Sequence, residues 1–297
     1  MRRTLGAIVV SGLLSACSPL GLLNATVPSG GVRITRDVPY GDGPARTLDV
    51  YQPAEPGQDR PLVVFFFGGS WKTGNKAEYR FVGTALARRG IVVAIPDYRL
   101  YPQTTFPGFL DDAAASVAWA VAHAAEFGAN PHPFLIGHSA GAYIAIMLAL
   151  NPAYLTEAGL PPRQIAGGVG IAGPYDFHPS QLPDIAPVFA GSPESRTQPI
   201  AFADGANRPL LLLAGADDTT VRPYNTTALA ARIAAHCGPV ESRVYPGIGH
   251  IGILLAFAPL FVGKAPVVAD VTRFVEANEP PARGSVRPCA RPMRVDK

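Results

Sequence analysis

Short, fully apolar runs alternate with longer helix-like stretches along the middle of this chain. The run at residues 62–67 reads Leu-Val-Val-Phe-Phe-Phe. A strand that is apolar at every position is buried on both faces, as in a parallel sheet covered by helices. This alternation predicts an α/β fold with a mostly parallel central sheet and helices on both faces. Four further runs of this kind lie at residues 91–95, 134–136, 166–171 and 209–213.

Other elements complete the predicted sheet and its helical layers. Two strands are expected at residues 32–38 and 46–51, around a Gly-Asp-Gly-Pro turn, and a third at residues 240–245. Residues 173–208 are rich in proline, show no clear period and are too long for an ordinary connection, so they predict a lid-like insertion. Helices are expected at residues 76–89, 109–127, 140–150 and 223–237.

Composition restricts the class of protein. The 297 residues are 48% hydrophobic and 16% charged, which excludes a disordered chain and provides enough apolar side chains for a sizeable core. The formal net charge is only +3, and Lys and Arg are not gathered within the predicted domain. Nucleic-acid binding therefore has no compositional support. We expect one folded domain over residues 31–278, followed by a basic, proline-rich tail at 279–297 that is predicted to be disordered.

The first residues have the pattern of an export signal. Arg2 and Arg3 precede an apolar run at residues 5–14, which is too short for a permanent membrane span. The next residues, Leu-Ser-Ala-Cys at 14–17, resemble a bacterial lipobox. The pattern predicts a lipoprotein signal peptide at residues 1–16, a lipidated Cys17 and a tether at 17–30. The protein is then expected on a bacterial membrane, in the outer membrane facing the periplasm; an ordinary signal peptide with a chance cysteine is the alternative.

Two further cysteines remain if Cys17 carries lipid. In an oxidising compartment Cys237 and Cys289 could form a disulfide, which would stabilise the fold by roughly 2–4 kcal/mol. Two unpaired thiols are the alternative, because sequence does not reveal the geometry.

A sharp turn at residues 137–141 carries the candidate nucleophile. The sequence there is Gly-His-Ser-Ala-Gly, between an expected strand and an alanine-rich helix. Glycines on each side allow the tight turn that exposes Ser139, and the helix start directs free N–H groups at a developing oxyanion. In this context the turn resembles the nucleophile elbow of the α/β-hydrolase family.

A serine hydroxyl needs a general base, and the base needs an orienting carboxylate. Of six histidines, His250 alone follows a strand in a glycine-rich loop, Pro-Gly-Ile-Gly-His at residues 246–250, so we expect it to be the base. The apolar run at 209–213 leads into Asp217 and Asp218. Either aspartate gives the chain order Ser, Asp, His of the α/β-hydrolase triad.

The loop after the first parallel strand extends the resemblance. Residues 67–71, Phe-Gly-Gly-Ser-Trp, are similar to the His-Gly-Gly-X-Trp motif of esterases related to hormone-sensitive lipase and of kynurenine formamidases. The resemblance implies an oxyanion hole made by the N–H groups of Gly69, Ser70 and Ala140. It departs at Phe67, which cannot form the hydrogen bonds by which a histidine there holds the loop.

Two further stretches resemble this family. They are Asp-Tyr-Arg-Leu-Tyr-Pro at 97–102 and Phe-Pro-Gly-Phe-Leu-Asp-Asp at 106–112, in which we expect Asp97, Arg99 and Asp112 to form structural ion pairs. In related hydrolases with an Asp-Asp pair before a valine-containing turn, the first aspartate belongs to the triad. The resemblance therefore implies Asp217 as the triad carboxylate, with Asp218 capping the following turn.

These residues predict a serine hydrolase that cleaves carboxylic esters of small molecules through an acyl-enzyme. An amidase such as an arylformamidase, or a peptidase, would use the same residues, and a binding protein on this fold would keep the scaffold without turnover. No metal or cofactor is predicted, because the chain has no His-X-X-X-His, no Cys-X-X-Cys and no Gly-X-Gly-X-X-Gly after a strand.

Overall fold

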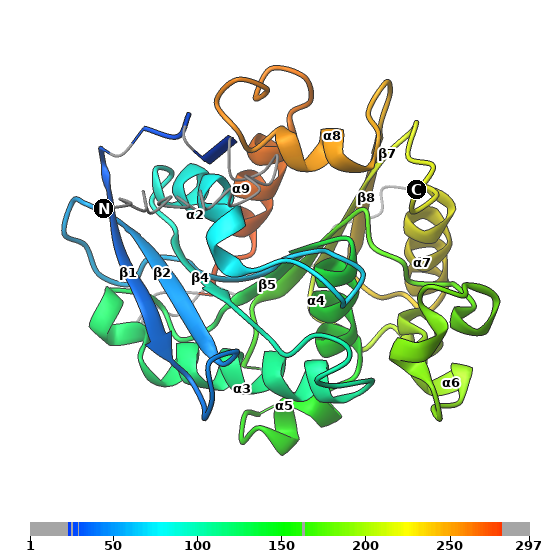
Figure 1. Ribbon diagram of the computed structural model, residues 1–297. Helices are drawn as coiled ribbons and strands as arrows, with labels where there is room; N and C mark the ends of the chain where they lie inside the picture. The colour runs from blue at the N-terminus through cyan, green and yellow to red at the C-terminus, as the bar shows by residue number, and fades with distance from the viewer. Residues whose placement is uncertain (1–22, 25, 29, 162–163, 281–297) are drawn as a thin grey trace, which may run out of the picture.

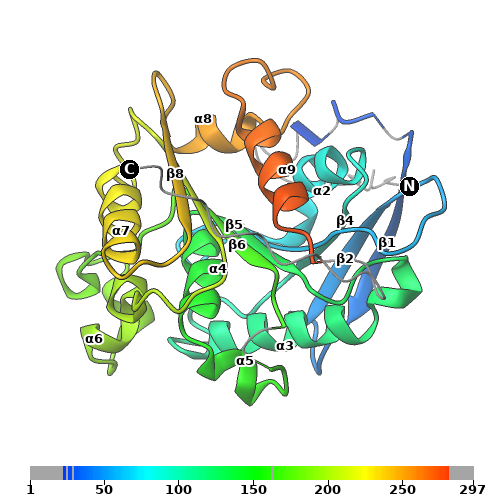
Figure 2. The same cartoon turned by 180° about the vertical axis from the view of Figure 1, so that it is seen from behind.

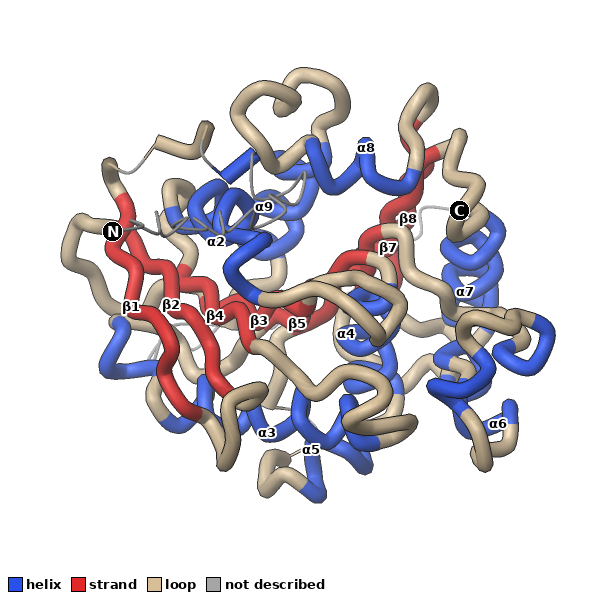
Figure 3. The backbone as a smooth tube through the Cα atoms, in the orientation of Figure 1, coloured by secondary structure: helices blue, strands red, loops and turns tan. Residues whose placement is uncertain are grey.

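A single eight-stranded sheet organises the part of the chain that the structure describes. This computed structural model describes residues 23–280, apart from 25, 29, 162 and 163. The strand order is β1-β2-β4-β3-β5-β6-β7-β8; β1 and β2 pair antiparallel and β2 joins β4 antiparallel, while all later pairs are parallel. Figure 3 shows the twisted sheet crossing the molecule. The strands are β1 Val32–Pro39, β2 Thr47–Pro53, β3 Leu62–Phe66, β4 Val92–Pro96, β5 Phe134–His138, β6 Gly167–Ile171, β7 Leu210–Gly215 and β8 Val240–Tyr245.

Burial follows each strand's place in the sheet. Every residue of β3, β4, β5, β6 and β7 is buried, as expected for strands covered on both faces. The edge strands β1 and β8 instead expose most of their residues or leave them half-buried. All eight strands predicted from sequence are present, which confirms the α/β class.

Helices cover both faces of this sheet. Figures 1 and 2 show α2, α8 and α9 on one face and α3, α4 and α5 on the other, while α7 packs against β7 and β8. None of the helices among the described residues is both long and apolar enough to cross a bilayer. The helices are α2 Arg80–Ala87, α3 Gly108–Ala122, α4 Ala140–Leu150, α5 Ala153–Glu157, α6 Glu194–Thr197, α7 Tyr224–Ala235, α8 His250–Leu255 and α9 Val267–Ala277.

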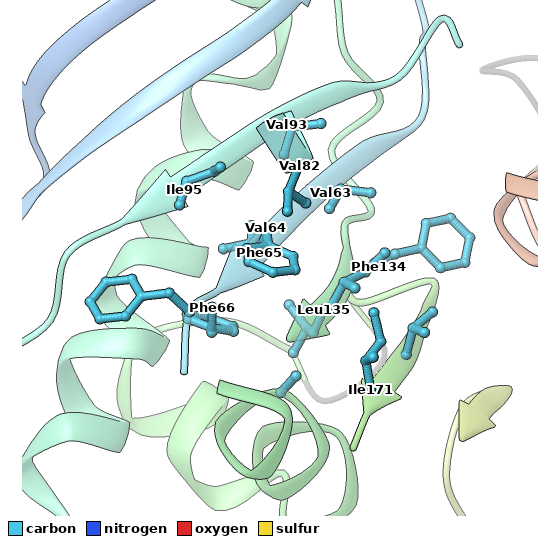
Figure 4. Close-up of a cluster of buried hydrophobic side chains, with 14 of the residues drawn as sticks. Val63, Val64, Phe65, Phe66, Val82, Val93, Ile95, Phe134, Leu135 and Ile171 are labelled. Atoms are coloured by element: carbon cyan, nitrogen blue, oxygen red, sulfur yellow. The ribbon is translucent and has the colours of Figure 1, made fainter. Parts of the chain in front are cut away.

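The core lies where β3, β4 and β5 meet the helices. Figure 4 shows Phe65 of β3 and Val93 of β4 close to Val82 of α2, while Leu135 of β5 lies farther away, toward the other face of the sheet. Each of these four side chains is fully buried. Since a buried large aliphatic or aromatic side chain contributes roughly 1.5–3 kcal/mol, this region fixes the strands that carry the site.

Two predicted helices are shorter than expected because each includes a 3₁₀ turn. Residues 76–89 form a 3₁₀ turn, Lys76–Tyr79, before α2, and residues 109–127 form α3 and then a 3₁₀ turn, Ala124–Phe127. Helices α5, α8 and α9 were not expected from sequence. Helix α9 has a sequence signal, because Val267, Val271, Phe274 and Val275 recur on one buried face.

The charged residues of the 97–112 region form ion pairs, as predicted. Asp112 is 1% exposed and accepts two hydrogen bonds of 2.8 Å from the Arg99 guanidinium, and Arg46 lies 3.0 Å from it. Asp97 accepts a 2.7 Å hydrogen bond from the backbone N–H of Lys76. These contacts join the loop after β4 to α3 and to the segment that follows β3.

Several expectations fall on residues outside the described ones. The signal peptide at 1–16, the lipidated Cys17 and residues 281–297 with Cys289 all lie there. Cys237 is exposed and forms no disulfide with another residue of the described part of the chain. A disulfide between Cys237 and Cys289 therefore stays untested.

Candidate active site

Ser139 lies on a strained turn between β5 and α4. Its backbone has φ 56° and ψ −122°, a conformation that L-residues avoid. The Ser139 N–H donates a 2.9 Å hydrogen bond to the carbonyl of Ile171 in the neighbouring strand. A Cβ at Gly137 would overlap the carbonyl of Gly141, and one at Gly141 would overlap that of Phe66. Only glycine fits these positions, so the turn holds the Ser139 side chain at the edge of the sheet.

His250 connects Ser139 to a buried carboxylate. Its Nε2 lies 2.9 Å from Ser139 Oγ, and its Nδ1 lies 2.7 Å from Asp218 Oδ2. An ionised carboxylate only accepts, so Nδ1 carries the hydrogen and donates it. The unprotonated Nε2 then accepts the Ser139 hydroxyl proton. The structure thus brings Ser139 and His250 together as the sequence predicted, although His250 begins α8 rather than lying in an open loop.

The carboxylate in this contact belongs to Asp218, so the prediction of Asp217 is wrong. Asp217 is exposed, and its backbone N–H donates to the carbonyl of Ile248 at 3.0 Å. Asp218 is 3% exposed and points inward beneath His250. Its second oxygen, Oδ1, accepts hydrogen bonds of 2.9 and 2.8 Å from the backbone N–H groups of Thr220 and Val221. One side chain therefore both caps the turn and orients the imidazole, two functions that the sequence analysis divided between neighbours.

The loop after β3 presents backbone N–H groups on the same side as Ser139. Gly69, Ser70 and Trp71 all have positive φ, at 126°, 54° and 57°. The carbonyl of Gly69 turns away and accepts the N–H groups of Lys72 and Thr73, each at 3.0 Å. Ser70, Ser139 and Ala140 line one cavity. Among the hydrogen bonds of the described residues, none is donated by the backbone of Gly69, Ser70 or Ala140, which leaves these groups available to an oxyanion.

Two tyrosines hold the loop where Phe67 replaces histidine. The Phe67 ring is fully buried and stacks on Tyr98 and Tyr79, with ring centroids 4.5 and 5.7 Å apart. The Tyr98 hydroxyl donates a 2.8 Å hydrogen bond to the Phe67 carbonyl, and the Gly68 N–H donates to the Tyr79 hydroxyl at 3.3 Å. Burial raises the pKa of Tyr98 well above its ordinary value, so its hydroxyl stays a donor. Hydrogen bonds between the two tyrosine hydroxyls and the loop backbone thus take the place of the missing histidine contacts.

A cavity of about 750 Å³ lies over these groups. Its opposite wall comes from residues 174–185 of the predicted insertion and from residues 219–225, which follow β7. Trp71 forms an aromatic wall with Phe177, whose ring stacks on it at 6.1 Å, and Phe189 meets the same indole edge-on at 4.9 Å. Among the described residues, no group of three or more His, Cys, Asp or Glu side chains is placed to hold a metal ion.

The insertion is fastened to the body of the protein. The Tyr143 hydroxyl of α4 donates to the Thr197 carbonyl at 2.7 Å, and Phe106 N–H donates to the Val188 carbonyl at 2.8 Å. The side-chain oxygen of Asn225 in α7 accepts the N–H groups of Tyr175 and Asp176 at 2.8 and 2.9 Å. In Figure 1 this segment lies below α7, and its 3₁₀ turn Pro199–Phe202 contacts that helix. The insertion therefore forms a docked wall of the cavity.

His138, the residue before Ser139, also belongs to the site. Its ring is 2% exposed, and Nε2 lies 3.0 Å from the backbone carbonyl of His250. Burial, together with the nearby His250, lowers the pKa of His138 to about 3. The sequence analysis assigned His138 no role, because its contact is with a residue 112 positions later in the chain.

The sequence of this chain is similar to those of several known proteins. A family model described as BD-FAE matches residues 48–179. A protein of Oryza sativa subsp. japonica named probable isoprenylcysteine alpha-carbonyl methylesterase ICME is 31% identical over 274 residues, covering 84% of this chain and 66% of that protein. Kynurenine formamidase of Danio rerio is 30% identical over 172 residues, covering 58% of this chain and 55% of that protein. This chain thus spans slightly less than two thirds of the length of the plant relative.

Solved structures share the arrangement of elements. Esterase B of Lactobacillus rhamnosis superposes with a TM-score of 0.75 at 20% identity, covering 88% of this chain and 90% of that one. The carboxylesterase EstE1, cloned from a metagenomic library, gives 0.73 at 19% identity, covering 88% and 94%. The chain therefore has the α/β-hydrolase fold. In this fold the candidate nucleophile follows β5, the carboxylate follows β7 and the histidine follows β8, in the chain order expected.

The Tyr98 contact predicts a measurable loss of stability. We expect Tyr98→Phe to lower the free energy of unfolding by about 1–3 kcal/mol, because it leaves the buried Phe67 carbonyl without its donor. Urea unfolding measures the change. Tyr101→Phe is a matched control, since the Tyr101 hydroxyl makes none of the hydrogen bonds found among the described residues; equal losses in the two variants would contradict the prediction.

The lowered pKa of His138 predicts an acid-sensitive fold. Between its ordinary pKa of 6.5 and about 3, the unfolded chain binds a proton at His138 that the folded chain does not. This group therefore makes the free energy of unfolding fall by about 1.4 kcal/mol per pH unit as the pH drops through that interval. His138→Gln should remove this contribution and flatten the acid side of the stability profile, measured by urea unfolding from pH 7 to 4. An unchanged slope would refute it.

Proposed function

We propose that this α/β-hydrolase cleaves carboxylic esters through a covalent acyl-enzyme, with Ser139 as nucleophile. The observation that carries the proposal is the continuous line of contacts from Ser139 Oγ through His250 to buried Asp218. Unpaired N–H groups and a cavity lie on the same side of Ser139. Together these are a nucleophile, a base, an orienting carboxylate and an oxyanion site, which is the complete requirement for acyl transfer.

In the proposed reaction each group has its own step. Ser139 Oγ attacks the ester carbonyl while His250 Nε2 takes the hydroxyl proton, and Asp218 stabilises the resulting imidazolium. The N–H groups of Gly69, Ser70 and Ala140 stabilise the tetrahedral oxyanion. His250 then gives its proton to the leaving alcohol. In the second half, His250 activates a water that hydrolyses the acyl-enzyme and releases the acid.

The cavity supports a substrate with an apolar part and a polar part. The stacked rings of Trp71 and Phe177 provide an aromatic wall for the apolar group. Asp176 lines the same cavity and accepts a 2.8 Å hydrogen bond from the Tyr224 hydroxyl, and His178 lies 2.8 Å from Glu194. The polar lining thus gathers on the insertion and α7. These features favour a small-molecule ester whose polar end contacts the insertion.

The likeness to kynurenine formamidase supports one alternative, an arylformamidase, which would use the same residues. Comparing phenyl acetate with N-formylkynurenine separates the two activities. A kcat/KM at least tenfold higher for the ester supports the esterase, and the reverse ratio supports the amidase.

The central test is a chain-length series of nitrophenyl esters, measured with the parent protein and with Ser139→Ala. We expect hydrolysis by the parent, with a preferred acyl length, and a loss of about 10⁴-fold or more in kcat for the variant, because its nucleophile is gone. Equal rates for the two proteins would show that Ser139 is not the nucleophile. Folding of the variant is checked by its thermal unfolding temperature.

The neighbouring aspartates offer a second, matched test. Asp218→Asn should lower kcat by about 10³–10⁴-fold, because the amide no longer fixes the required tautomer of His250. Asp217→Asn changes an exposed side chain and should leave kcat within about twofold. The esterase series above measures both. The opposite order would restore Asp217 to the triad.

We also propose that the protein is exported and held on a bacterial membrane, in the outer membrane facing the periplasm, by a lipid on Cys17. The support is the basic, apolar and Leu-Ser-Ala-Cys pattern of residues 1–17. Cells grown with radiolabelled palmitate should label the parent protein and not Cys17→Ala. Equal labelling of the two, or none on the parent, would remove the anchor.

A further inference from the structure

His138 contacts each of the parts that meet at Ser139. It is the last residue of β5 and directly precedes Ser139, and its Nε2 lies 3.0 Å from the carbonyl oxygen of His250. Its Nδ1 is buried, has no hydrogen-bond partner among the described residues and faces the loop after β3, where a Cβ on Gly68 would lie 3.2 Å from it. The two imidazole rings have centroids 4.8 Å apart. One side chain thus lies between the nucleophile turn, the base and the oxyanion loop.

The contact fixes the tautomer of His138. A backbone carbonyl only accepts, so the hydrogen of the neutral ring is on Nε2 and is donated to His250. Nδ1 is then a bare acceptor. This is the form expected of a ring whose burial disfavours the charged state.

We propose that His138 is a positioning residue, which holds the backbone of His250 so that the imidazole stays aligned with Ser139. The proposal rests on the proposed function and adds a specific requirement to it: a hydrogen-bond donor at position 138.

The element that carries His250 explains why such a contact is needed. Helix α8 has only six residues and follows Gly247 and Gly249, residues that permit a wider range of backbone conformations than other amino acids. The side chain of His250 is held by Asp218 and Ser139, and neither of these contacts involves its backbone. The His138 bond fixes that backbone from the strand that carries Ser139. Ser139 and His250 are then connected twice. One connection is the contact between their side chains, and the other is the hydrogen bond from His138, the neighbour of Ser139, to the backbone carbonyl of His250.

The neutrality of His138 matters as well. During acyl transfer His250 becomes an imidazolium, with Asp218 as its counter-ion. A second cation at ring distance would oppose this charge in a buried site. A donor that carries no charge satisfies the carbonyl of His250 without that repulsion.

The test compares His138→Gln with His138→Met, two side chains of similar length of which only glutamine can donate a hydrogen bond. With a nitrophenyl ester, we expect His138→Met to lower kcat at least tenfold with KM within twofold of the parent. His138→Gln should recover kcat to within threefold. His236→Gln, at an exposed histidine after α7, is the control and should match the parent. Thermal unfolding checks each variant, and His138→Leu replaces His138→Met if the latter does not fold.

The proposal would be overturned if folded His138→Met, or its substitute His138→Leu, kept the kcat of the parent. It would also be overturned if folded His138→Gln were as slow as this donorless variant. A second readout does not need turnover: the proton NMR signal of the His250 Nδ1–H donated to Asp218. It should broaden or shift in the donorless variant and stay in place in His138→Gln. If the parent itself hydrolyses no ester, the proposed function has failed, while this signal still decides whether His138 positions His250.

Discussion

The backbone conformation of Ser139 is the constraint on which the rest of the site depends. A non-glycine residue with φ 56° and ψ −122° costs of the order of 1–3 kcal/mol, and it persists only if its surroundings enforce it. Here the strand pairing of β5 with β3 and β6 fixes one side of the turn, and the fully buried start of α4 fixes the other. The glycines at 137 and 141 allow the neighbouring backbone to approach. The core therefore stabilises the conformation that exposes the side chain of Ser139, the proposed nucleophile.

Much of this arrangement is predictable because it follows from local pattern. Fully apolar strands, the glycine-flanked serine and the histidine after the last strand are each visible within a few residues of sequence. The choice between Asp217 and Asp218 cannot be made from such a local pattern. Adjacent residues point in different directions, and only the course of the turn determines which of them is buried under the imidazole. Both aspartates suit such a turn chemically, so the resemblance to other hydrolases led to the wrong one.

The contacts that sequence could not predict are those between distant segments. Tyr98 and Tyr79 support the loop at Phe67, although they lie 31 and 12 positions after it in the sequence. Neither tyrosine belongs to the motif that it supports. The bond from His138 to the carbonyl of His250 is of the same kind. Helix α8 was missed because glycines surround its start, while its stability comes from packing on β7. In each case tertiary contact, and not local propensity, determines the outcome.

The segment between β6 and β7 can change in evolution independently of the residues around Ser139. It supplies much of the cavity wall, yet Ser139, Asp218 and His250 all lie on other parts of the chain. Because the insertion is fastened by a small number of hydrogen bonds and ring contacts, its length and side chains can be replaced while the sheet and the reacting groups are kept. Selectivity and chemistry are thus encoded in separable stretches, and a new specificity could be grafted onto this scaffold by exchanging one surface segment.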